Sequence, residues 1–163
     1  MAYINASEAS SFVTLVFSTA TISSTATTGM IVVPGLQNIT VNNGNGVFRW
    51  KTLDSGSEKA IATPATNQLS LNIVMDPTTF FGSTTTNQVT AAERGLFKLS
   101  NDKTPIYFRM YWNATTPTTG SKYVTAVEGS FITGLSPTVS PDSPVWLAPL
   151  TLEVSGDFTA SVV

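Results

Sequence analysis

The sequence predicts a mainly β protein, a single-domain β-sandwich or barrel with one flanking α-helix. Three observations support this fold class. Short runs of β-branched and aromatic residues alternate with turn residues along most of the chain. One segment alone combines a helix cap with an apolar stripe at helical spacing. The length of 163 residues is that of one domain with a substantial core, so residues 1–163 are expected to form a single unit.

The first half of the chain reads as a series of strands. The sequence Asn-Asn-Gly-Asn-Gly at residues 42–46 predicts a hairpin turn, because Asn and Gly tolerate positive φ. Residues 54–57 are expected to end the returning strand, and residues 58–67, which include Pro64, to form a loop. The expected strands are residues 11–19, 30–33, 37–41, 47–53 and 68–75, the last with apolar and polar residues in alternation.

The predicted helix spans about residues 90–100. Thr90 and Glu93 have the spacing of a capping box, in which Thr90 is the N-cap and Glu93 reaches back to it. Gly95 weakens the helix. The apolar stripe consists of Ala92, Leu96 and Leu99, with Phe97 beside it.

The chain after the helix is predicted to form three more strands. They are residues 105–112, 122–135 and 145–159, and the last two flank a turn made of Ser, Pro and Asp. Gly129 lies inside one of these runs, where it predicts a bulge or a close approach of two backbones.

The composition argues against an enzyme and against a nucleic-acid binder. The chain has no cysteine and no histidine, which removes thiolate ligands and the commonest general base. The net charge is −2, whereas proteins that bind DNA neutralise phosphates with Lys and Arg. No cofactor is expected. Only 11% of the residues are charged, against about 25% in a typical soluble domain. This suits a surface that faces other copies of the chain and equally suits a secreted β protein rich in Thr and Ser.

The sequence shows neither a targeting segment nor a membrane span. Its first residues lack a basic region followed by an apolar one, and the apolar runs are much shorter than the ~20 residues of a membrane helix. We therefore expect synthesis and assembly in the cytoplasm, without a membrane partner. Asn5, Asn38 and Asn113 begin glycosylation sequons. In a chain so rich in Ser and Thr we attribute them to chance.

The order of motifs near the C-terminus is the most informative feature. The chain reads GLSPTVS, then DSPV, then LEVSGDFT, and earlier KTLDS, EK and QLSLNIVMD. This order resembles the major tail tube proteins of long-tailed bacteriophages, of the siphophage or myophage type. The resemblance covers roughly residues 37–159, and residues 1–36 match only in being β-like, as an N-terminal arm or strand.

The resemblance implies a structural virion protein. Its copies would form hexameric rings, each chain giving a sheet to a larger barrel, and the rings would stack into the tail tube that conducts DNA into the host. The implied partners are other copies of the chain, tail-tip, terminator and tape-measure proteins, and a sheath protein if the tail is contractile. DNA would pass without specific binding. The location would be the virion tail, assembled in the host cytoplasm.

The same resemblance assigns surfaces to parts of the chain. The C-terminal strands and residues 68–75 would form the inner sheet. The loop near residues 54–67 and the N-terminal arm would reach the next ring. The inter-ring loop residues are Asp54, Ser55, Gly56, Ser57, Glu58 and Lys59.

Glu128 and Glu153 lie in the two C-terminal runs and have three interpretations. They are solvated charges on an outer face, or an acidic ring that lines a channel and repels phosphate. The least supported interpretation is a glycosidase-type acid/base pair. Asp142 and Asp157 are expected in turns.

Trp50, Trp112 and Trp146 all fall on predicted strands. Packing in the core or at a subunit interface is favoured over stacking on bases or sugars. The alternative to a tube subunit is a β-sandwich decoration or adhesin domain that binds a host-surface or capsid partner. A carboxylate-based hydrolase is the third class.

Overall fold

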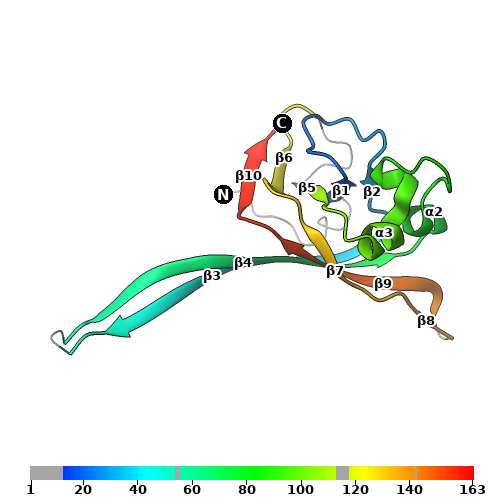
Figure 1. Ribbon diagram of the computed structural model, residues 1–163. Helices are drawn as coiled ribbons and strands as arrows, with labels where there is room; N and C mark the ends of the chain where they lie inside the picture. The colour runs from blue at the N-terminus through cyan, green and yellow to red at the C-terminus, as the bar shows by residue number, and fades with distance from the viewer. Residues whose placement is uncertain (1–12, 54–55, 113–117, 142) are drawn as a thin grey trace, which may run out of the picture.

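The computed structural model describes residues 13–53, 56–112, 118–141 and 143–163. It is mainly β, with two sheets and two short helices in the described residues (Figure 1). The strands are β1 (Thr14–Ser18), β2 (Ile31–Val32), β3 (Leu36–Lys51), β4 (Glu58–Val74), β5 (Tyr107–Trp112), β6 (Lys122–Ala126), β7 (Phe131–Leu135), β8 (Thr138–Ser140), β9 (Ser143–Val154) and β10 (Phe158–Val162). The helices are α2 (Pro77–Phe81) and α3 (Ala91–Asn101). The mainly β fold class is confirmed.

One core joins the two sheets. The short sheet has the order β10-β6-β5-β1-β2, and the long sheet has the order β3-β4-β9-β7 with β8 beside β9. Their strand pairs are all antiparallel. The shared core takes side chains from the short sheet and from the long sheet, among them Leu15, Phe17, Phe108, Met110, Leu69, Leu71, Ile73, Leu150 and Leu152.

The alternation predicted for residues 68–75 is confirmed. Leu69, Leu71 and Ile73 are buried, while Ser70 and Asn72 between them are half-buried. Because successive side chains of a strand point to opposite faces, this half of β4 presents one apolar face to the core and one polar face outward.

The hairpin turn predicted at residues 42–46 is wrong. These residues lie within β3, and the chain reverses between Lys51 and Glu58, which pair with each other. The strand pairing shifts register between Gly44 and Gly46, and a Cβ on Gly46 would overlap the Thr63 hydroxyl. Gly44 and Gly46 therefore lie at a β-bulge where the two strands approach closely, and they do not form a turn.

The loop predicted at residues 58–67 is also wrong, because this segment is the first half of β4. Pro64 lies at the shift, where the pairing passes from Thr66 directly to Thr63. Proline has no N–H to give to a ladder, so a bulge is one of the few places where a strand accepts it.

Each of the two C-terminal runs, predicted as one strand, divides between the sheets. Residues 122–135 form β6 in the short sheet and β7 in the long sheet, and residues 145–159 contribute to β9 and β10 in the same way. Gly129 lies in the first connection, residues 127–130, and not inside a strand. The predicted close approach is present, because a Cβ there would come within 2.8 Å of Pro105 Cβ. The predicted turn after β7 also contains the short strand β8.

The predicted helix is α3, and its capping box is confirmed. The Glu93 N–H donates to Thr90 Oγ1 over 3.4 Å, and Glu93 Oε2 accepts from the Thr90 N–H over 2.8 Å. Gly95 does more than weaken the helix: its φ of 73° kinks α3. Its missing side chain allows close contact with the chain at Phe80 and Gly82. The buried stripe comprises Ala91, Leu96 and Leu99, so Ala91 takes the place expected for Ala92.

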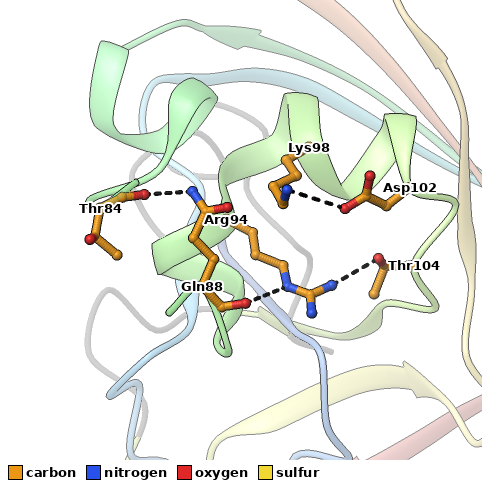
Figure 2. A network of polar contacts seen from close by, with 6 residues as sticks. All are labelled: Thr84, Gln88, Arg94, Lys98, Asp102 and Thr104. Carbon is orange, nitrogen blue, oxygen red and sulfur yellow. Dashed lines mark hydrogen bonds and ion pairs between the residues drawn. The ribbon is translucent and has the colours of Figure 1, made fainter. Parts of the chain in front are cut away.

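Arg94 forms hydrogen bonds with the segment before α3 and with the segment after it (Figure 2). Its Nε donates to the Gln88 carbonyl over 3.0 Å, and its guanidinium donates to Thr104 Oγ1 over 3.1 Å. Lys98 and Asp102 form an ion pair of 3.7 Å one turn apart. These contacts fix the helix that covers one end of the core.

The helix α2 was not expected from the sequence. Asp76 is its N-cap and accepts from the N–H groups of Thr78 and Thr79, and Pro77 begins it. Asp before Pro is a helix-start signal, but a run of only five residues gives no periodicity to detect.

Candidate functional site

No group of three or more Asp, Glu, His or Cys among the described residues could hold a metal ion. Two carboxyl groups have a clearly shifted pKa, and both cap helices. The Thr79 hydroxyl and the N–H groups of Thr78 and Thr79 lower the pKa of Asp76. The N–H of Thr90 is the main cause that lowers the pKa of Glu93. Both pKa shifts therefore arise from hydrogen bonds at the N-terminus of a helix.

The outer face of the long sheet is polar and nearly uncharged. Three cross-strand rows make up much of it: Asn42, Gln68 and Glu153; Thr40, Ser70 and Thr151; Asn38, Asn72 and Pro149. On β7, Phe131 pairs with Glu153 and is 40% exposed, so it adds one aromatic side chain beside the first row. Glu153 carries the charge of these rows, and its Oε2 accepts a 3.5 Å hydrogen bond from Gln68. Such a face offers hydrogen bonds to water and no cation to hold phosphate.

The two predicted acidic residues occupy different elements. Glu153 lies on β9, whereas Glu128 lies in the connection 127–130 between the sheets. Glu128 Oε2 accepts a 2.7 Å hydrogen bond from Ser155 Oγ, which belongs to the other connection between the sheets. Glu128 therefore joins the two connections between the sheets by a hydrogen bond. The prediction that Glu128 lies inside a strand was wrong.

The described part of the predicted inter-ring loop, residues 56–59, lies at the end of a long hairpin of β3 and β4 that projects from the body (Figure 1). Gly56 and Ser57 lie at its tip, and Asp54 and Ser55 lie outside the described residues. Glu58 and Lys59 begin β4 as the partners of Lys51 and Trp50. Glu58 forms an exposed ion pair of 3.5 Å with Arg49.

One face of this hairpin is apolar and exposed. Phe48 pairs with Ile61, and their exposed fractions are 59% and 57%. Trp50 lies on the same face, with its ring 5.9 Å from that of Phe48. We call Phe48, Trp50 and Ile61 the hairpin face. Single exposed apolar residues are common, but a contiguous group marks a surface for a partner.

A second apolar surface lies at the other end of the long sheet. It is a pocket of about 200 Å³ between α2, the end of β4 and the start of β9, and we call it the α2 pocket. The Met75 N–H donates to the Trp146 carbonyl over 2.9 Å, which joins the two sides. The lining residues are Met75, Asp76, Pro77, Phe80, Phe81, Pro137 and Trp146.

The tryptophans have different surroundings. Trp112 packs against the core, which is one of the two roles predicted for the tryptophans, the other being packing at a subunit interface. Trp50 is 36% exposed and Trp146 is 52% exposed, so neither belongs to the core. No local sequence pattern predicts the α2 pocket, because its walls come from segments far apart in the chain.

Comparison with solved structures identifies the fold. A chain from the tail of an empty gene transfer agent particle, computed by helical refinement with C6 symmetry, matches with a TM-score of 0.61. The two share 11% identity, over 97% of this chain and 98% of that one. A chain from the virion of a native gene transfer agent particle matches with a TM-score of 0.59 at 11% identity, over the same shares. The chain has the fold of these tail proteins.

Another match comes from a contractile injection system. A chain in the structure of an extracellular PVC sheath/tube terminator has a TM-score of 0.53 and 13% identity, over 80% of this chain and 87% of that one. No family model and no curated protein matches the chain. The tail-tube type of fold, first suggested by the C-terminal motifs, is confirmed. None of the helices among the described residues is long and apolar enough to cross a membrane.

Proposed function

We propose that this protein is the subunit of a phage-type tail tube, whose copies form hexameric rings that stack around a DNA channel. The observation that carries the proposal is the long sheet. Its β3 and β7 are edge strands within the chain, and its outer face is polar and nearly neutral. The fold of a tail subunit with six-fold symmetry supports the same arrangement.

Closing a ring would complete the long sheet. Barrels enclose an aqueous channel only at roughly 16–18 strands or more, which exceeds what one chain supplies. If β7 of each copy lay beside β3 of the next, one continuous barrel would form and the exposed edges would disappear. The short sheet and the helices would then lie outside this barrel.

The polar outer face would line the channel. Asn, Gln, Ser and Thr side chains hold water without attracting phosphate, and Glu153, repeated around the ring, would repel it. Of the C-terminal strands assigned to the inner sheet, β7 and β9 belong to the long sheet, and β6 and β10 do not. The lumen role is therefore better supported for Glu153 than for Glu128.

Contacts between rings would come from the projecting hairpin. Its tip, with Gly56 and Ser57, lies far from the body (Figure 1). Tail-tip, terminator and tape-measure proteins are the further partners of such a tube, and a sheath protein if the tail contracts. The site of action would be the virion tail, after assembly in the host cytoplasm.

Negative-stain electron microscopy of the purified chain over a range of concentrations tests the proposal. We expect rings, and at high concentration hollow tubes with a central channel. Monomers at every concentration would contradict it and favour the decoration or adhesin alternative.

The lumen assignment has its own test in complemented particles that carry Glu128→Lys and Glu153→Lys, singly and together. We expect Glu153→Lys to reduce DNA delivery while tails still assemble, because lysines in the channel would hold phosphate. Glu153→Gln is the matched control and should deliver DNA nearly as well as the unmodified chain. Normal delivery by the double lysine variant would contradict the assignment.

A further inference from the structure

The hairpin face and the α2 pocket lie at opposite ends of a single strand. β4 runs from Glu58, near the hairpin tip, to Val74, two residues before the N-cap of α2. An extended strand rises about 3.3 Å per residue, so the 14 residue steps from Ile61 to Met75 separate the two surfaces by roughly 45 Å. The end of the hairpin and α2 lie at opposite sides of the molecule (Figure 1), so a chain cannot place its own hairpin in its own pocket.

The two surfaces have matching chemistry. The hairpin face offers two aromatic rings and the branched side chain of Ile61. The walls of the α2 pocket are two phenylalanines, two prolines, a methionine and a tryptophan. Phe81 and Trp146 are 66% and 52% exposed, so the pocket opens to the surface.

Charge also matches across the two surfaces. Lys59 pairs with Trp50 and thus lies on the side of the hairpin that carries the hairpin face. No ion pair joins Lys59 to another described residue. Among the described residues that line the pocket, Asp76 carries the charge, and its carboxylate caps α2. The hairpin face thus has a lysine beside it and the α2 pocket has a carboxylate in its lining, and these charges are opposite.

We propose that the hairpin face of one copy docks in the α2 pocket of a second copy, with Lys59 near Asp76. The inference rests on the proposed function and names the two surfaces that join successive copies. Because the two patches differ and lie at opposite ends of the chain, the contact is heterologous and leaves a free patch at each end. A contact of this kind can be repeated from copy to copy, so it supports growth of a filament or tube along its axis.

Cysteine cross-linking tests the contact directly, because the natural chain has no cysteine. Ile61→Cys is placed on the hairpin of one preparation, and Phe81→Cys in the pocket of a second preparation that carries a larger tag. The two are mixed under assembly conditions and oxidised. We expect a disulfide heterodimer as the main product. Val162→Cys, at a 56% exposed position on the edge strand β10, replaces Phe81→Cys in the control mixture and should give little heterodimer.

A charge reversal sharpens the test. Lys59→Glu, introduced with Ile61→Cys, should reduce the heterodimer yield several-fold, because two carboxylates would then meet. Lys51→Glu is the matched control: Lys51 pairs with Glu58 on the opposite face of the hairpin and should leave the yield unchanged. Thiol titration of each variant shows that both cysteines are reactive before mixing.

The outcomes separate this inference from the proposed function. Rings or tubes without the hairpin–pocket cross-link, or with equal yields for Phe81→Cys and Val162→Cys, overturn the inference and leave the function standing. A preparation in which the natural chain stays monomeric at every concentration overturns both.

Discussion

The two halves of β4 show how one strand serves two purposes. From Asn67 to Val74 it lies between β3 and β9, with alternate side chains buried in the core. From Glu58 to Thr66 it pairs with β3 alone, and almost every residue is exposed. A two-stranded ribbon has little stability of its own, so its apolar residues contribute little to the isolated fold. Burial within one copy therefore identifies the residues that stabilise the fold, and the exposed apolar side chains are those that we propose for contacts between copies.

The largest expected effect contrasts the two halves directly. Leu71→Ala should lower the free energy of unfolding by about 2–5 kcal/mol, because it opens a cavity in the core. Ile61→Ala in the exposed half should change it by about 0.5 kcal/mol or less. Urea denaturation of both variants measures this. Similar losses at the two positions would contradict the division.

A smaller effect is expected at the kink of α3. Gly95→Ala should cost about 1–3 kcal/mol, because the residue has positive φ and a Cβ would approach the Phe80 carbonyl oxygen to 2.6 Å. Gly56→Ala is the control, since a Cβ at that position meets nothing within 4 Å. Thermal unfolding compares them, and an unchanged Tm for Gly95→Ala would show that the helix–helix contact can relax.

The N-terminal cap of α3 should contribute less. Thr90→Ala removes the hydroxyl that accepts from the Glu93 N–H and should lower the free energy of unfolding by about 1 kcal/mol. Thr28→Ala removes an exposed hydroxyl outside the helices and serves as the control. Equal stability of the two variants in urea would mean that the capping box does not hold α3.

The smallest effect is a pH dependence at the helix end of the molecule. The folded-state pKa values of Asp76 and Glu93 lie below their ordinary values of 3.8 and 4.5. Their contribution to stability is therefore present above those ordinary values and is lost as the pH falls through the lower folded values. Asp76→Asn and Glu93→Gln should each flatten the fall of stability below about pH 4.5. Unfolding curves between pH 7 and pH 2.5 measure this, and a slope as steep as that of the natural chain would contradict the assignment.

Local sequence predicted the elements whose geometry is decided locally. The alternation of Leu69, Leu71 and Ile73 and the spacing of Thr90 and Glu93 depend only on nearby residues, and both predictions were confirmed. Residues 42–46 were misread because glycine and asparagine suit a turn and a bulge alike, and the choice depends on the strand opposite.

Surfaces made from distant segments were beyond the reach of the sequence. The α2 pocket joins residues 75–81 to Pro137 and Trp146, and no local pattern records that contact. The crossings between sheets at residues 127–130 and 155–157 interrupt runs that look continuous in composition. The outer polar face could be predicted for residues 68–75, but its neighbours on β9 required the strand order.

Cryo-electron microscopy of tubes grown from the purified chain tests the central claim most directly. We expect a hollow tube whose channel is lined by the outer face of the long sheet, with Gln68 and Glu153 toward the lumen and each projecting hairpin covered by a neighbouring copy. A tube lined by the short sheet, or a solid filament in which the hairpins remain in solvent, would contradict the account.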